Sequence, residues 1–160
     1  MTRRELEITD IEEIRGILDR AQVLHLGLVD DGFPYIVPMN YGYEMEDGKL
    51  TVYLHSGMKG HKIEVIRNNP RCCFELECDL IPFDGPKLCM NGMSYSSLMG
   101  RGRAEILQGF EERRRAMNIL MKTQRGQEYD FSEKMLSAVH MIKIEVTEYT
   151  AKRRPLPLER

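Results

Sequence analysis

The 160-residue sequence lacks any apolar run close to the ~20 residues that a membrane-spanning helix needs. It also lacks a secretory signal, because residues 1–5 run into acidic residues without an apolar segment. Both absences argue against an exported or membrane-embedded protein. We therefore expect a cytoplasmic protein with no membrane partner.

A strong charge of one sign is missing as well. The chain holds 23 Lys and Arg against 25 Asp and Glu, for a formal net charge of −2, and the two signs are interspersed. Proteins that bind nucleic acids usually carry a clear basic excess. Two short basic runs, at 113–115 and 152–154, are interpreted as solvated surface. No nucleic-acid partner is expected.

Cysteine pairs with metal-binding or redox spacing are absent too. The four cysteines are Cys72, Cys73, Cys78 and Cys89, and no two of them form a Cys-x-x-Cys motif. Zinc-ribbon and thioredoxin-like sites therefore lack their usual spacing, and no metal site is predicted. In a cytosolic chain we expect reduced thiols. One of Cys72 and Cys73 is expected to pack into the core, since free cysteine is often buried.

What the sequence does contain is hydrophobic periodicity that predicts short helices between about six or seven strands. Helices are expected over 11–20, 60–68, 109–123 and a short stretch from Ser132. Strands are expected over 23–29, 33–43, 50–55, 71–78, 89–107 (as one strand or two) and 138–149, with a loop over 79–88.

The turns between these strands indicate how they pair. Tight turns such as Asp30-Asp31-Gly32 favour antiparallel pairing, in a barrel or sandwich. Pro34 and Pro38 cannot donate hydrogen bonds, so the strand over 33–43 should lie at a sheet edge or carry a bulge. The whole chain, 1–160, is predicted to form one mainly β domain with short flanking helices. A loose C-terminal tail is expected over about 151–160.

The passage from the third predicted strand into the helix at Gly60 has the composition of an anion site. A helix N-terminus offers free N–H groups and a partial positive charge. Ser56 adds a hydroxyl, Lys59 and Lys62 add formal charge, and His61 adds a further donor. These groups suit a phosphate, although the Gly-x4-Gly-Lys-Ser/Thr pattern of a P-loop is absent. A solvated turn with surface lysines is the alternative interpretation.

Two further stretches could contact a ligand. Around Pro38, over 35–41, strand backbone groups should be left unpaired beside apolar and aromatic side chains, which suits the edge of a planar heterocycle. The stretch 94–104 carries hydroxyls and glycines that could approach a ligand closely. The alternatives are an irregular edge strand and a bulged strand, respectively.

Taken together, these stretches carry a resemblance. The motifs are Gly-Leu-Val-Asp-Asp-Gly-x-Pro-Tyr-x-Val-Pro-x-Asn (27–40), His-Ser-x-x-x-Gly-His-Lys-Ile (55–63) with Asn-Pro (69–70), and Gly-Arg-Ala-Glu (102–105). In order and spacing they resemble the pyridoxamine 5′-phosphate oxidase-like flavoproteins, and among these the 5-nitroimidazole-resistance subgroup. The resemblance covers about residues 5–150.

The resemblance implies a split β-barrel homodimer that binds FMN at the subunit interface. It implies phosphate contacts at Ser56, His61 and Lys62, beside Gly60, with His55 near the ribityl chain or the ring. The residues implied to line the isoalloxazine with backbone and side chains are Val37, Pro38, Met39, Asn40 and Tyr41.

Other residues have weaker expectations. Ser96 and Ser97 are implied on the partner's side of the flavin. His25 and His140 are interpreted as structural histidines. The flavin would carry the chemistry, so no conventional acid–base residue is predicted, and His55 is the weak candidate.

The implied function is an FMN-dependent oxidoreductase that reduces a small nitro compound, quinone or similar acceptor. A nicotinamide donor would dock transiently, because the sequence shows no second nucleotide-binding fold. FAD in place of FMN stays open. The alternatives are a flavin- or haem-binding module without turnover, and a pyridoxamine 5′-phosphate oxidase proper. The oxidase is the less favoured alternative, because the Arg-rich signature expected near its C-terminus is not evident in this sequence.

Overall fold

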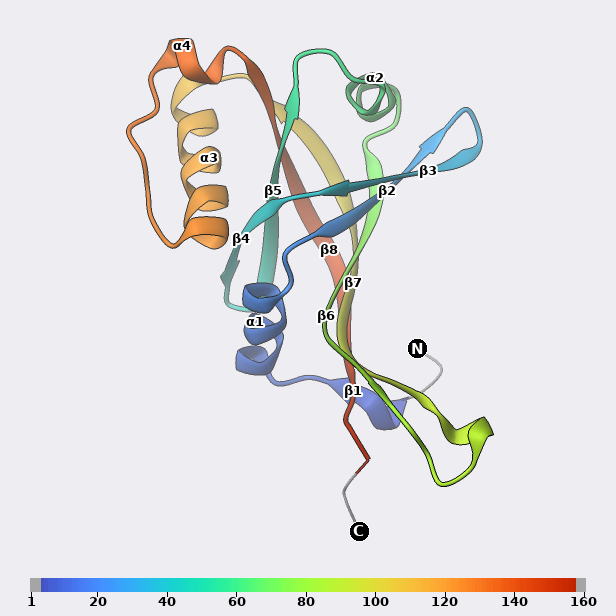
Figure 1. The fold of residues 1–160 in the computed structure, drawn as a ribbon. Helices are drawn as coiled ribbons and strands as arrows, with labels where there is room; N and C mark the ends of the chain where they lie inside the picture. The colour runs from blue at the N-terminus through green and yellow to red at the C-terminus, as the bar shows by residue number, and fades with distance from the viewer. Residues whose placement is uncertain (1–3, 158–160) are drawn as a thin grey trace.

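The structure, a computed structural model, describes residues 4–157. In this part of the chain one antiparallel sheet of eight strands runs in the order β3-β2-β6-β7-β8-β5-β4, with β1 paired to β8 (Figure 1). The strands are β1 (Glu7–Ile8), β2 (Leu24–Asp30), β3 (Phe33–Met39), β4 (Tyr41–Glu46), β5 (Lys49–Gly57), β6 (Arg71–Phe83), β7 (Gly92–Leu107) and β8 (Val139–Arg154). The predicted mainly β split barrel is confirmed, with eight strands in place of six or seven.

The extra strands have simple origins. The two-residue β1 is too short to show a period in the sequence. The segment predicted as one strand over 33–43 divides at Asn40 into β3, which pairs with β2, and β4, which pairs with β5. β3 and β4 lie at the two ends of the strand order. The edge position predicted from Pro34 and Pro38 is therefore confirmed.

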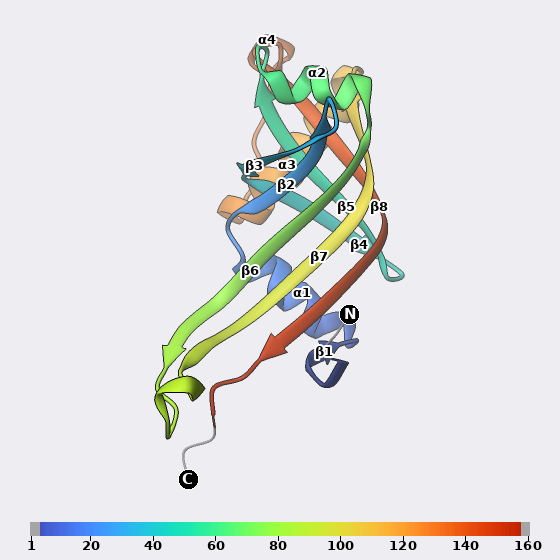
Figure 2. The ribbon, with the colours of Figure 1, turned by 90° about the vertical axis from the view of Figure 1, so that its right-hand side faces the viewer.

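The long strands extend beyond their predicted ends. β6 continues to Phe83, with a register shift between Cys78 and Ile81, so the first half of the loop expected over 79–88 is strand. Together with the start of β7 it forms an arm that projects from the body of the molecule (Figures 1 and 2). β7 is one strand with a register shift at Gly102.

The predicted loose tail over 151–160 is wrong in its first part. β8 runs to Arg154, and Ala151 is buried between Leu98 of β7 and Ile8 of β1. The long strand β7 pairs with the end of β8 and keeps residues 151–154 in the sheet. The sequence alone does not reveal this pairing. The strand ends before Pro155, and the last predicted tail residues, 158–160, lie outside the described residues.

The helices follow the predictions closely. They are α1 (Ile11–Arg20), α2 (His61–Asn68), α3 (Phe110–Arg125) and α4 (Glu133–Leu136), with 3₁₀ turns at Arg4–Leu6 and Leu88–Met90. Asp10 caps α1 by accepting a hydrogen bond from the Glu13 N–H at 2.9 Å. Among the described residues, no helix has the length and apolar character needed to cross a membrane.

Two hydrophobic clusters hold the fold together. The larger one packs Ile14, Ile17 and Leu18 of α1 against the inner face of the sheet. The smaller one gathers around Tyr53 and Met141, on the other face, beneath α3 and α4. The close approach of α3 is visible at Gly42 of β4, where an added Cβ would lie 2.4 Å from the Leu120 Cα.

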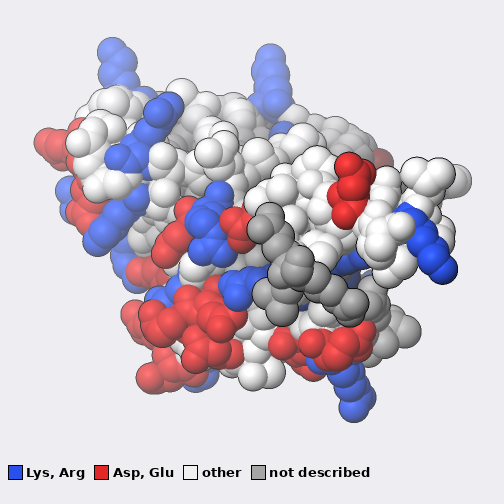
Figure 3. Space-filling view, turned by 60° about the horizontal axis from the view of Figure 1, so that its bottom comes forward, with Lys and Arg blue, Asp and Glu red and all other residues white. Residues whose placement is uncertain are grey.

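Charged side chains of both signs cover the surface. Figure 3 shows Lys and Arg beside Asp and Glu on one face of the molecule, without a continuous basic area. This mixture agrees with the interspersed charges of the sequence.

Candidate functional site

The predicted phosphate site lies where β5 leads into α2. β5 extends through Gly57, so Ser56 is a strand residue paired with His140 of β8 and is only 5% exposed. The helix begins at His61, with Gly60 as its N-cap. Figure 2 shows α2 at one end of the barrel, near the tip of the β2–β3 hairpin.

Three groups converge at this helix end. The Lys62 Nζ donates a hydrogen bond to the Ser56 Oγ at 3.2 Å. A Cβ added at Gly60 would lie 3.5 Å from that Nζ and 3.6 Å from that Oγ. Gly60 supplies no side chain to cap the first helical turn, which leaves N–H groups at the start of α2 for a ligand. We call this space, bounded by Ser56, Gly60 and Lys62, the cradle.

The cradle has the chemistry of a phosphate site. Gly60 has an extended φ of 179°, so its backbone does not require glycine. What the missing side chain provides is room beside an ammonium, a hydroxyl and a helix N-terminus. These are the donors that bind a phosphate dianion.

His61 is directed elsewhere. Its Nε2 lies 2.5 Å from the Asp30 Oδ2 at the end of β2, and its ring meets the Tyr35 ring edge-on at 5.5 Å. The hydrogen bond to Asp30, and then the charge of that carboxylate, raise the pKa of His61. None of the hydrogen bonds found among the described residues joins His61 to Ser56 or Lys62. Asp30 was missed in the sequence analysis because no local pattern reveals that the β2–β3 turn folds onto α2.

His55 does not face the cradle. Side chains alternate along a strand, so His55 lies on the face of β5 opposite Ser56, with Tyr53. Its Nδ1 is buried and has no hydrogen-bond partner within the described residues. His55 is therefore on the opposite side of β5 from Ser56, and its expected place near the ribityl chain or the ring stays a prediction.

The stretch from Val37 to Tyr41 is only partly available to a ligand. Met39 and Tyr41 are buried in the larger cluster, and the Tyr41 hydroxyl donates to the carbonyls of Leu18 and Ala21 at 2.7 and 3.1 Å. Their burial leaves little of these two side chains for contact with a flavin, and their place in the flavin site stays a prediction. Burial also raises the pKa of Tyr41, which keeps its phenol protonated.

The neighbours of those two residues differ. Val37 is half-buried against the core, whereas Pro38 and Asn40 are exposed at the edge of the sheet. Asn40 donates from Nδ2 to the Gln22 carbonyl at 3.3 Å. The exposed side chains of this stretch and its edge backbone are thus what remains for contact with a ring.

Ser96 and Ser97 are buried in their own chain, at 1% and 7% exposure. The Ser96 Oγ accepts a hydrogen bond from the Arg153 Nε at 3.3 Å. The expected contact of Ser96 with a partner's flavin conflicts with this enclosure. Ser97 pairs in register with Glu77 and Lys152, and its small exposed fraction leaves little for a ligand.

A separate hollow of about 890 Å³ lies between α3 and β4. Charged side chains dominate its lining, and there the Arg115 Nη2 lies 2.6 and 2.8 Å from the two oxygens of the Glu44 carboxylate that accept its hydrogen bonds. None of the predicted site residues lines it. The candidate site is therefore the cradle with the adjoining β3 edge.

Comparisons with known proteins show the family and the fold. The family described as pyridoxamine 5′-phosphate oxidase matches residues 10–153. A candidate 5-nitroimidazole antibiotic resistance protein from Bacteroides thetaiotaomicron is 33% identical, with a TM-score of 0.79, over 92% of this chain and 86% of that chain. No match was found among curated proteins.

Two more distant structures show the same fold. The FAD- and haem-binding protein from Mycobacterium smegmatis is 15% identical, with a TM-score of 0.79, over 96% of this chain and 76% of that one. An FAD-binding protein from Mesorhizobium loti is 24% identical, with a TM-score of 0.63, over 91% and 96%. At these identities the likeness concerns the fold.

Proposed function

Because the chain belongs to the pyridoxamine 5′-phosphate oxidase family, we propose that it is a flavoprotein that binds FMN and transfers electrons to a small acceptor. The observation that carries the proposal is the cradle at Ser56, Gly60 and Lys62. It offers an ammonium, a hydroxyl and uncapped helical N–H groups around open space, as a phosphate-bearing cofactor requires.

Different residues would contact the phosphate and the ring of the cofactor. Lys62 and the α2 N-terminus offset the charge of the phosphate. Ser56 fixes the Lys62 ammonium through its hydrogen bond. The edge of β3 near Pro38 and Asn40 offers backbone groups and exposed side chains to the ring. A bound flavin supplies the redox chemistry, and the protein supplies position and electrostatics.

The proposed acceptor is a small nitro compound, a quinone or a similar molecule, and a nicotinamide would dock transiently as the electron donor. Support comes from the 33% identity to the Bacteroides thetaiotaomicron protein, described by its role in 5-nitroimidazole resistance. FMN is preferred because the cradle accounts for one terminal phosphate. The two FAD-binding structures keep FAD as the alternative to be tested.

We also propose that the protein works as a homodimer with the flavin at the subunit interface. The arm between β6 and β7 exposes apolar side chains that a second copy would cover, among them Leu88 at 90% exposure. The other exposed apolar residues of the arm are Leu80, Ile81, Met90 and Met93. Exposed apolar groups gathered in this way are typical of protein interfaces. A Leu88→Asp variant that stays dimeric in light scattering would argue against the arm as the contact.

Reconstitution tests the cofactor. The purified protein is incubated with FMN or with FAD, freed of excess cofactor, and its absorption spectrum is recorded. We expect flavin bands with one FMN per chain and slow oxidation of NADH or NADPH that a nitroaromatic acceptor accelerates. Bound flavin without turnover would favour a binding module, and a Soret band after haem addition would favour the haem-binding alternative. Oxidation of pyridoxamine 5′-phosphate would instead identify an oxidase proper.

A further inference from the structure

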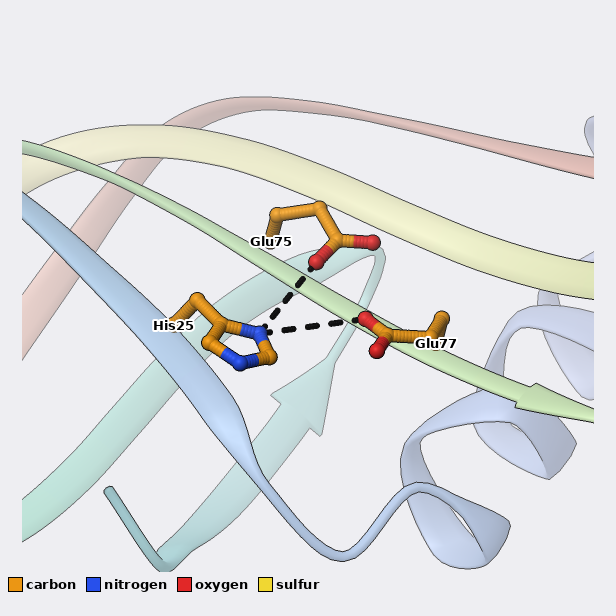
Figure 4. Close-up of side chains that lie close together, drawn as sticks. All are labelled: His25, Glu75 and Glu77. Atoms are coloured by element: carbon orange, nitrogen blue, oxygen red, sulfur yellow. Dashed lines mark ion pairs between the residues drawn. The ribbon is translucent and has the colours of Figure 1, made fainter. Parts of the chain in front are cut away.

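A second group of polar side chains lies away from the cradle, on the outer face of the sheet. His25 of β2 is the direct register partner of Glu75 of β6, and Glu77 follows Glu75 on the same face. Figure 4 shows the His25 imidazole turned toward both carboxylates. We call these three residues the His-Glu-Glu group.

The donor atoms of this group are close together. The His25 Nδ1 lies 3.5 Å from the Glu75 Oε2 and 3.8 Å from the Glu77 Oε2, and one ligand atom from each residue lies within 4.8 Å of the others. Two ligands of one tetrahedral zinc ion, each about 2.0–2.1 Å from the metal, are about 3.3 Å apart. The two distances from His25 are therefore within about 0.5 Å of this spacing, and the two carboxylate oxygens lie no more than 4.8 Å from each other.

The backbone already fixes this arrangement. His25 and Glu75 sit on hydrogen-bonded neighbouring strands, and β6 is held on its other side by β7. The side chains are half-buried, at 40%, 35% and 33% exposure, so an ion could enter from solvent and keep an open position. Binding would need small rotamer changes without rearrangement of the strands.

The electrostatics of the group also favour a cation. Two carboxylates, Glu75 and Glu77, share one small area beside the same His25 nitrogen. Lys152 is a nearby ammonium that offsets part of their negative charge. A divalent ion would relieve the crowding of negative charge more fully than one lysine does.

We propose that His25, Glu75 and Glu77 form a binding site for a divalent transition-metal ion of the zinc class. One imidazole nitrogen with two carboxylate oxygens suits such an ion better than calcium or magnesium, which prefer all-oxygen sites. Three protein ligands leave the fourth position to water, as in zinc sites that are not purely structural. The proposal takes no ligand from the flavin site, because neither the cradle nor the β3 edge shares a residue with this group; His25 is the register partner of Pro38, which is why the test uses protein with and without flavin.

Direct metal binding tests the proposal. The flavin-loaded and the flavin-free protein are each titrated with Zn²⁺ in competition with a chromophoric chelator. We expect one Zn²⁺ per chain, bound at least about tenfold more weakly after His25→Gln or Glu77→Gln. Glu148→Gln is the matched control, since Glu148 is an exposed β8 carboxylate paired with Arg101. Its affinity should equal that of the unmodified protein.

The exposed Cys73 precedes Glu75 on the same face of β6 and is the competing ligand to exclude. Cys73→Ser should retain full Zn²⁺ affinity. Co²⁺ added to the unmodified protein should give visible bands of a nitrogen- and oxygen-ligated ion without a sulfur charge-transfer band. The proposal is overturned if Zn²⁺ does not bind, if the His25 and Glu77 variants bind it equally well, or if Cys73→Ser abolishes binding. The first result would leave the group as an ion pair of His25 with two glutamates.

Discussion

The β3–β4 stretch and the β5–α2 passage belong to the same set of motifs, yet the structure uses their residues differently. In the first, Met39 and Tyr41 pack into the core, and the Tyr41 hydroxyl donates hydrogen bonds to two carbonyls at the end of α1. In the second, Ser56 and Lys62 converge on a space that Gly60 leaves open. A set of motifs of this kind can therefore mix residues that build the fold with residues that are left available to a ligand.

This comparison predicts that substitutions in the two stretches have separable effects. Tyr41→Ala should lower the free energy of unfolding by about 3–5 kcal/mol, because it empties a fully buried aromatic site. Chemical denaturation of the flavin-free protein measures this change. Tyr41→Phe serves as the control for packing and should cost about 1 kcal/mol, the worth of the lost hydrogen bond.

If Tyr41→Phe instead weakened FMN binding while stability stayed constant, the division between fold and site would be wrong. The phenol would then have to reach the ligand, which its burial and its bonds to Leu18 and Ala21 oppose.

The opposite pattern is expected in the cradle. Ser56→Ala combined with Lys62→Ala should weaken FMN binding by a few kcal/mol, or roughly a hundredfold in Kd, because charge-assisted hydrogen bonds to the phosphate are lost. Stability should change little, since Lys62 contributes no core packing. Fluorescence titration with FMN measures the affinity. Lys59→Ala is the control, because Lys59 is an exposed lysine of the same passage. If both variants lost the same FMN affinity, general charge attraction rather than a directed phosphate contact would explain the loss.

Gly60 offers a sharper test of the same space. Gly60→Ala should raise the Kd for FMN at least about tenfold, because the added Cβ would sit 3.5–3.6 Å from the Lys62 Nζ and the Ser56 Oγ, where the phosphate must lie. The extended backbone accepts alanine, so the variant should fold normally. Gly57→Ala is the matched control, because its Cβ would meet nothing within 4 Å. Unchanged affinity in Gly60→Ala would place the phosphate elsewhere.

The contrast also shows how far the sequence could be read. Local signals sufficed for α1, whose cap and apolar stripe are both encoded within 10–20. They sufficed for β6 as well, where the alternating apolar residues Cys72, Phe74, Leu76 and Cys78 are all buried. They also sufficed to group Ser56 with Lys62, which are hydrogen-bonded, since strand, loop and helix are adjacent in the chain.

Non-local pairing is where the sequence prediction failed. The side-chain directions around Asn40 depend on β3 and β4 joining different neighbours, and no local pattern encodes that choice. The pairing of β2 with β6 brings His25 to Glu75 across a long stretch of chain, so the His-Glu-Glu group could not be foreseen. The same holds for Asp30 and His61, which meet through the packing of the hairpin on α2.

The smallest predicted effect concerns that last pair. Asp30→Asn should bring the pKa of His61 down toward its ordinary value of 6.5, because the hydrogen bond and charge of Asp30 are the main causes of the increase. A raised folded-state pKa means that the pair stabilises the protein below the unfolded value and loses this contribution as pH rises through the folded value. NMR titration of the imidazole protons measures it. Glu64→Gln should shift the pKa less, since Glu64 lies farther away at 3.6 Å. An equal shift in both variants would mean that the general charge around α2, and not the directed contact with Asp30, holds the proton on His61.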